Sequence, residues 1–200
     1  MISIIDYGAS NLRSVAKAFE FLGIPVRFAE RASDVARADK LILPGVGAFG
    51  KAIEAVRQHK FAEAIGEHLD KGKPLLGICL GMQLLLTESE EMGQHQGLNV
   101  IAGKVKRFDD TKDKVPQIGW NSLDFIRRDA LLFKGIDEGA FVYFVHSYYC
   151  VPEVGTAAEA YYAGQRFTAA IEKNSIFAVQ FHPEKSGETG LRILKNFAQL

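Results

Sequence analysis

The chain has 200 residues, of which 24 are Lys or Arg and 24 are Asp or Glu, so its formal net charge is zero. A chain of this length is expected to form one globular domain over residues 1–200, and its balanced charge offers no basic field for nucleic acid or an acidic membrane surface. The longest apolar stretch, 74–86, is too short to span a bilayer, and two cysteines provide no disulfide framework, which together indicate a cytoplasmic protein.

The first half of the chain alternates short β-branched apolar runs with longer segments of helical period. This alternation is typical of β-α-β units in a parallel sheet. In chain order we expect a strand at 1–5, a helix at 11–22, strands at 26–28 and 40–43, a glycine-rich loop at 44–50, one long helix from there to about Lys71, a strand at 75–78 and a helical segment at 82–88.

The second half shows shorter spacing and more two-residue alternation, which favours antiparallel strands. We expect strands at 105–108 and 141–149, a charged loop at 109–114, a late strand at 176–181 and a closing helix at 187–200. The expected fold is therefore α/β: a doubly wound, mostly parallel sheet with helices on both faces and an added antiparallel β-layer in the second half.

Cys79 lies between the buried strand 75–78 and the helical segment 82–88, with Gly77 and Gly81 on either side. A sharp strand-to-helix turn with flanking glycines is the pattern of a nucleophile elbow, here with Cys in place of Ser. Such a turn lifts the thiol above the carboxyl edge of the sheet, at the start of a helix. Taken alone, the pattern fits equally a small buried cysteine between two packing glycines.

A base for this nucleophile is available at the end of the last strand. His182 and Glu184 are two residues apart, so in extended chain they point the same way, and the carboxylate can orient the imidazole toward Cys79. A His-x-Glu pair alone also fits a surface or capping pair, and the match to the elbow is what favours a triad. The sequence offers no further clustered ligands for a metal.

Stabilisation of an oxyanion requires N–H donors close to the nucleophile. The N–H of Leu80, directly after the cysteine, is placed to supply one. The loop 44–50 follows a strand and lies at the same edge of the sheet, so that the peptides at Val46 and Gly47 can supply a second. The loop lacks the Gly-Lys-Ser/Thr ending of a phosphate-binding loop.

Residues 77–83 (GICLGMQ) and 181–184 (FHPE) resemble the class I, or triad-type, glutamine amidotransferases. Further segments resemble the glutaminase subunits of imidazole glycerol phosphate synthase over the full length of the chain: DYG at 6–8, NLRSV at 11–15, PGVGAF at 44–49, GWN at 119–121, YFVHSY at 143–148 and QFHPEKS at 180–186.

The resemblance implies an enzyme that hydrolyses L-glutamine without a cofactor. Cys79 would form a γ-glutamyl thioester, with His182 and Glu184 completing the triad. The ammonia would pass to a (β/α)8-barrel cyclase subunit, HisF, in a heterodimer that converts the nucleotide PRFAR to imidazole glycerol phosphate and AICAR. By the same resemblance, further residues are assigned to glutamine (Gln83, Ser147 and Tyr148) and to the face toward the cyclase (Asn11, Trp120, Asn121 and Lys185).

Three other functions fit parts of the sequence. Another glutaminase, such as that of pyridoxal phosphate synthesis, is disfavoured by the segments 119–121 and 146–148. A silent amidotransferase-like subunit that binds glutamine or a partner is disfavoured by the intact triad. A general cysteine hydrolase would need an open cleft, whereas Gln83 beside the elbow indicates a small, polar and closed pocket.

Overall fold

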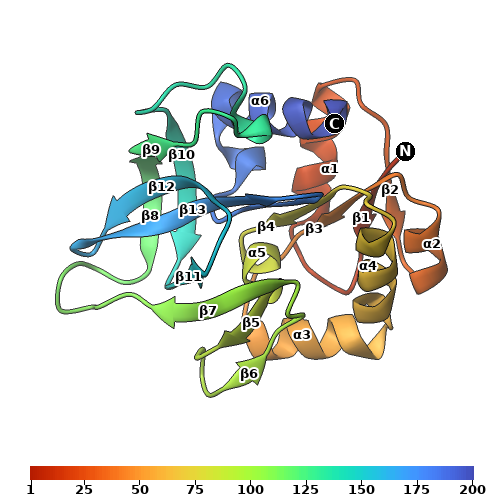
Figure 1. The fold of residues 1–200 in the computed structure, drawn as a ribbon, viewed down its shortest axis with the longest axis horizontal. Helices are drawn as coiled ribbons and strands as arrows, with labels where there is room; N and C mark the ends of the chain where they lie inside the picture. The colour runs from red at the N-terminus through yellow and green to blue at the C-terminus, as the bar shows by residue number, and fades with distance from the viewer.

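The computed structural model describes residues 1–200 as a large mixed sheet flanked by helices, with a second sheet of two strands (Figure 1). The helices are α1 (Leu12–Phe21), α2 (Ala32–Ala36), α3 (Phe49–Gln58), α4 (Phe61–Asp70), α5 (Leu80–Leu84) and α6 (Gly187–Gln199), with short 3-10 turns η1 (Leu131–Phe133) and η2 (Pro183–Lys185). The strands are β1 (Ile2–Ile5), β2 (Val26–Ala29), β3 (Lys40–Leu43), β4 (Leu75–Ile78), β5 (Leu86–Ser89), β6 (His95–Gln96), β7 (Ile101–Arg107), β8 (Gln117–Ser122), β9 (Phe125–Ile126), β10 (Phe141–His146), β11 (Tyr148–Pro152), β12 (Thr156–Tyr162), β13 (Gln165–Lys173) and β14 (Ile176–Val179).

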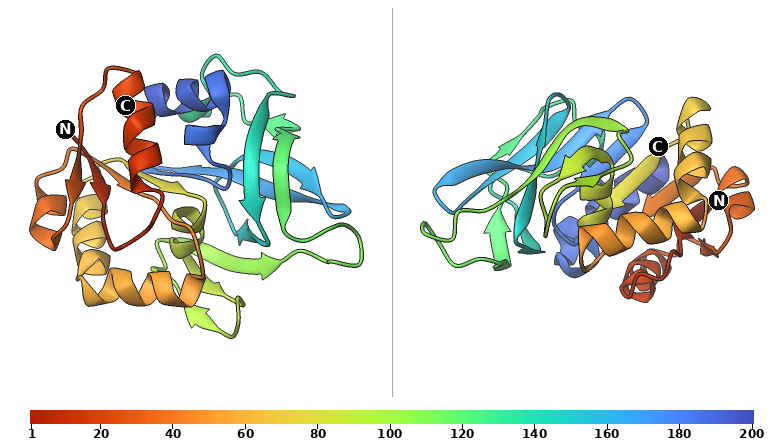
Figure 2. Two further views of the ribbon diagram at one scale, coloured as in Figure 1. Left: turned by 180° about the vertical axis from the view of Figure 1, so that it is seen from behind. Right: turned by 90° about the horizontal axis from the view of Figure 1, so that it is seen from below.

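The parallel part of the large sheet has the strand order β2-β1-β3-β4-β14. Successive residues of each strand pack into different cores, as expected for strands buried on both faces. Ile42, Leu76 and Phe177 belong to the core that α1 and α6 cover, whereas Leu41 and Leu75 belong to the core that α3 and α4 cover. The predicted doubly wound α/β architecture is confirmed, with helices on both faces (Figure 2).

The antiparallel strands of the second half mostly extend this same sheet. Strand β13 pairs antiparallel with β14, and the order continues antiparallel through β11 and β7. Beyond β7 the sheet ends with β5, which pairs parallel with β7, and with β6. Only β8 and β10 form a separate antiparallel pair, which stands beside β12 and β13 (Figure 2, left). The predicted antiparallel layer is therefore partly a continuation of the large sheet and partly a separate two-stranded sheet.

Several predicted elements have different limits in the structure. The single long helix expected after the glycine loop is two helices, α3 and α4, which point in different directions (Figure 1). Lys60 between them has a left-handed backbone, with φ of 57°, and this conformation ends one helix and redirects the chain. None of the helices combines the length and the apolar composition that crossing a membrane requires.

The segment after the elbow was expected to be helical over 82–88, but α5 ends at Leu84 and β5 begins at Leu86. The residues on both sides of this change are fully buried leucines, and a short apolar run does not distinguish a buried helix from a buried strand. The expected strand at 141–149 is likewise two strands, because the chain leaves β10 for the other sheet at Ser147.

Candidate active site

The carboxyl ends of four neighbouring parallel strands meet at one edge of the sheet. Tyr7 follows β1, the glycine loop follows β3, Cys79 follows β4 and His182 follows β14. Because β1, β3, β4 and β14 are consecutive neighbours in the sheet, residues far apart in the sequence come together at this edge. Ligands of open α/β sheets bind at such an edge.

The elbow has the strained backbone that its sequence indicates. Cys79 has φ of 54° and ψ of −110°, an unusual conformation for a residue with a side chain. A Cβ added at Gly81 would lie 1.8 Å from the carbonyl oxygen of Leu43, so only glycine allows α5 to pack this closely against the end of β3. The side chain of Cys79 is almost fully buried but lines a cavity.

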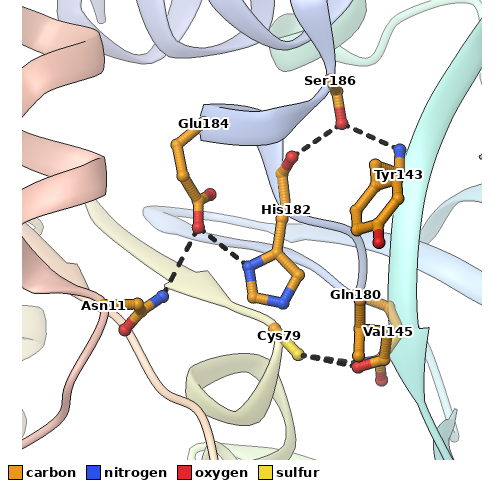
Figure 3. Close-up of polar contacts among 8 residues, drawn as sticks. All are labelled: Asn11, Cys79, Tyr143, Val145, Gln180, His182, Glu184 and Ser186. Atoms are coloured by element: carbon orange, nitrogen blue, oxygen red, sulfur yellow. Dashed lines mark hydrogen bonds and ion pairs between the residues drawn. The ribbon is translucent and has the colours of Figure 1, made fainter. Parts of the chain in front are cut away.

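His182 and Glu184 form the second part of the constellation. The Nδ1 of His182 lies 2.8 Å from Oε1 of Glu184, and both side chains are almost completely buried. The other ring nitrogen points toward the sulfur of Cys79 (Figure 3). A carboxylate that accepts from Nδ1–H fixes the tautomer in which Nε2 faces the nucleophile.

The charge state of His182 depends on these same neighbours. Burial lowers the pKa of its imidazole, but the hydrogen bonds and negative charges of Cys79 and Glu184 outweigh burial and raise this pKa to about 10. These neighbours therefore favour the protonated ring. A group that holds a proton beside a nucleophilic sulfur can deliver it to a leaving group.

Sequence reasoning missed two residues that fix the histidine and the cysteine. Ser186 accepts the N–H of Tyr143 at 3.0 Å and donates to the carbonyl of His182 at 2.7 Å (Figure 3). These two bonds connect the segment that carries His182 to β10. The fully buried Gln180 places its amide nitrogen 3.7 Å from the sulfur of Cys79. The sequence signal for both residues is their place at the two ends of the QFHPEKS segment, where neither was given a role.

The elbow, the histidine and the glycine loop line one cavity of about 320 Å³. Its walls contain the predicted nucleophile and base, the predicted oxyanion donors and the predicted glutamine contacts, together with residues that the sequence did not single out: Val46, Gly47, Cys79, Leu80, Gln83, Glu91, Pro116, Val145, His146, Ser147, Tyr148, His182 and Lys185. A cavity of this size suits a small polar substrate.

The polar wall of the cavity is held by hydrogen bonds. Gln83 donates to the carbonyl of Tyr148 at 3.0 Å and to the side chain of Gln180 at 3.1 Å. Glu91 accepts the N–H of Phe49 at 2.8 Å, and burial raises the pKa of its carboxyl although this bond opposes the shift. Glu91 lies twelve positions after the elbow, and no motif marks it.

The four residues assigned to a partner lie in different surroundings. The side chain of Trp120 is 55% exposed on β8, and Lys185 is exposed at the end of η2. The side chain of Asn121 points to the other face of the strand, where it donates to the carbonyl of Tyr161 at 2.9 Å. Asn11 is buried and its amide nitrogen lies 3.5 Å from Oε1 of Glu184, so in this chain it contacts the triad rather than the surface.

Comparison with known proteins adds an independent observation. The family model described as glutamine amidotransferase class-I matches residues 3–200. The imidazole glycerol phosphate synthase subunit HisH of Chlorobaculum tepidum is 57% identical over 201 residues, and that of Chlorobium luteolum is 56% identical over 201 residues, each with 100% of both chains covered. A solved structure, PurLQS from Thermotoga maritima, has a similar fold, with a TM-score of 0.78 and 18% identity over 99% of this chain and 97% of that one.

Proposed function

The chain belongs to the class I glutamine amidotransferases, and we propose that it works as the glutaminase subunit of an imidazole glycerol phosphate synthase. The observation that carries this proposal is a cysteine on a strained elbow, faced by a buried His–Glu pair, in a chain that matches HisH subunits over its whole length. The proposed substrate is L-glutamine and the proposed acceptor of its ammonia is a cyclase subunit of the HisF type.

The first half of the reaction forms a thioester. The sulfur of Cys79 attacks the carboxamide carbon of glutamine, and the C–N bond breaks as the tetrahedral intermediate collapses. His182 donates a proton to the departing nitrogen, so ammonia leaves and a γ-glutamyl thioester remains. Glu184 keeps the ring oriented and stabilises its positive charge before this transfer.

The second half regenerates the enzyme. The neutral His182 accepts a proton from water as the water oxygen attacks the thioester carbon. The C–S bond then breaks, glutamate leaves, and the sulfur and the imidazolium return to their starting state. One residue thus acts first as acid and then as base, which requires a fixed ring with one nitrogen free for the reaction.

Negative charge develops on the carbonyl oxygen in both halves. The N–H of Leu80 opens α5, and N–H groups in the first turn of a helix have no partner one turn earlier. The peptides at Val46 and Gly47 line the same cavity and supply the second donor. Donors fixed in this way stabilise the transition state without reorganisation, and each contributes on the order of 3 kcal/mol.

The rest of the cavity recognises the amino-acid end of glutamine. Gln83 and the main chain at Ser147 and Tyr148 form one polar wall. Glu91 supplies a carboxylate for the α-ammonium group on the side of the glycine loop. A cavity that contains both a carboxylate and polar main chain suits the amino-acid end of glutamine, which is a zwitterion.

The cyclase docks on the exposed face of the β8–β10 pair. Ile118, Trp120 and Phe141 are 63%, 55% and 57% exposed there, and Trp120 packs against Tyr143 with ring centroids 6.0 Å apart. Lys185 lies nearby, at the mouth of the cavity. An apolar patch rimmed by a cation beside the site where ammonia forms is suited to a partner that must receive it without loss to solvent.

Glutamate release from glutamine tests the proposal. It is measured for the purified chain alone and then with a HisF-type cyclase that carries its nucleotide substrate PRFAR. Strong stimulation by the loaded partner is expected. Hydrolysis at a rate that does not change when this partner is added would assign the chain to another synthase. No hydrolysis in either case would indicate a subunit without catalytic activity.

A further inference from the structure

The loop that carries the second oxyanion donor is attached at its two ends and free in its middle. Gly45, Val46 and Gly47 take part in no main-chain hydrogen bond within the chain. At the start of the loop, the hydroxyl of Tyr7 donates to the carbonyl of Pro44 at 2.8 Å, and at its end Glu91 accepts the N–H of Phe49. The peptides between these anchors have no partner of their own that fixes their direction.

We propose that Tyr7 is a positioning residue of the glutaminase site: its hydroxyl holds the first peptide of the loop, and so directs the N–H groups at Val46 and Gly47 toward the oxyanion. The inference rests on the proposed glutaminase function. Tyr7 lies in the DYG segment directly after β1, which is the neighbour of β3 in the sheet, and it is not among the residues that line the cavity.

Packing around Gly45 supports this role. A Cβ added there would lie 2.7 Å from the hydroxyl oxygen of Tyr7 and 2.9 Å from the main-chain nitrogen of Gly81. Gly45 therefore packs closely against both the Tyr7 hydroxyl and the elbow.

The hydrogen bond between Tyr7 and Pro44 is expected to persist over a wide range of pH. The ring is 5% exposed, and burial together with the charge of Cys79 raises the pKa of its hydroxyl, so the proton needed for the bond stays in place over the whole range of enzyme activity. Without the hydroxyl, the buried carbonyl of Pro44 has no partner in the chain, and the loop gains other conformations of similar energy.

Tyr7→Phe tests the inference because phenylalanine keeps the ring and removes only the bond. In the complex with the loaded cyclase, kcat for glutamine is expected to fall roughly tenfold with little change in KM, since the donors act on charge that exists only in the transition state. Ammonia-driven synthesis is expected to be unchanged. Alkylation of Cys79 by iodoacetamide, which forms no oxyanion, is expected to keep its wild-type rate.

Asn196→Ala is the matched control for lost stability. Asn196 lies in the last turns of α6 and donates to the carbonyls of Leu132 and Lys134, so its removal leaves buried carbonyls unpaired far from the loop. This variant is expected to keep the wild-type kcat at a similarly lowered melting temperature. Cys79→Ala confirms by mass spectrometry which cysteine the reagent modifies.

Three results would overturn the inference. Wild-type kcat in Tyr7→Phe would show that the loop needs no hydroxyl anchor, while the glutaminase function stands. Equal losses in Tyr7→Phe and Asn196→Ala, or a parallel fall in the alkylation rate, would assign Tyr7 to general stability or to the nucleophile. A wild-type complex that hydrolyses no glutamine would overturn the proposed function together with the inference.

Discussion

The two cysteines lie in different parts of the large sheet and have different surroundings. Cys79 follows a parallel strand, has a strained backbone and lines a cavity. Cys150 lies within the antiparallel strand β11, is 1% exposed, and burial raises the pKa of its thiol well above the usual value. One residue type is therefore placed for chemistry in the first case and for packing in the second.

The parallel and antiparallel strands supply different parts of the candidate site. The parallel part ends four strands at one edge and so supplies the reacting groups and the oxyanion loop. The antiparallel strands supply the rest. Tyr148 on β11 of the large sheet and Val145 on the separate β8–β10 pair form cavity walls, and Trp120 on β8 lies in the exposed apolar face. Catalysis and partner binding are thus expected to respond separately to substitutions in the two parts.

The largest expected effect is a loss of stability at low pH. It comes from His146 on β10. Burial, and to a smaller extent the charge of His182, lowers its pKa from the ordinary value of 6.5 to about 4. Between these two values the unfolded chain binds more protons than the folded one, so the free energy of unfolding falls as pH decreases from 6.5 to 4. At about 1.4 kcal/mol per pKa unit, the loss is roughly 3 kcal/mol.

Denaturant unfolding of the wild type and of His146→Gln between pH 4 and 7 measures this loss. The variant is expected to show a flatter dependence on pH, because its side chain does not titrate. His182 does not mask the effect: its raised pKa adds stability that is fully present below pH 6.5 and is lost only as pH rises through about 10. Equal slopes for the two proteins would show that His146 is charged in the folded state.

Trp120→Ala is expected to have a smaller effect, and only on the partner. A large aromatic side chain at the centre of an interface contributes about 2 kcal/mol, so the dissociation constant of the cyclase complex is expected to rise roughly 30-fold. Titration calorimetry measures this change. Glutamine hydrolysis at saturating cyclase is expected to stay near the wild-type rate.

Phe21→Ala is the control for the loss of an exposed aromatic residue. Phe21 is 78% exposed at the end of α1, at the opposite edge of the sheet from the catalytic residues, and its removal is expected to leave the affinity unchanged. If Trp120→Ala binds the cyclase as tightly as the wild type, the β8–β10 face is not the docking surface.

The positions of the candidate reacting residues could be predicted from the sequence where a chemical motif coincides with the end of a strand. The limits of β3 and β4 were predicted correctly because each is a short, mostly apolar run with a proline at one end, Pro44 after β3 and Pro74 before β4. The break at Lys60 could not be predicted, because lysine gives no signal for a left-handed backbone as Gly or Asn does.

The remaining parts of the site depend on tertiary contacts. Tyr7 and Glu91 reach opposite ends of the glycine loop from positions 37 and 42 residues away in the chain, so only the strand order and the β5–β6 region bring them there. Asn121 was assigned to the cyclase face together with Trp120 by resemblance, and in the structure its side chain leaves the opposite side of the strand and donates to the carbonyl of Tyr161. Local pattern specified the reacting groups, and topology specified what holds them.

We propose that Cys79 is the nucleophile that releases ammonia from glutamine. The most direct measurement compares glutamine-driven with ammonia-driven synthesis by the cyclase complex that contains Cys79→Ala, with Cys150→Ala as the matched variant. We expect Cys79→Ala to lose glutamine-driven synthesis and to keep ammonia-driven synthesis, and Cys150→Ala to keep both. Loss of both activities in Cys79→Ala would contradict the account and would assign the residue to the fold or to the interface.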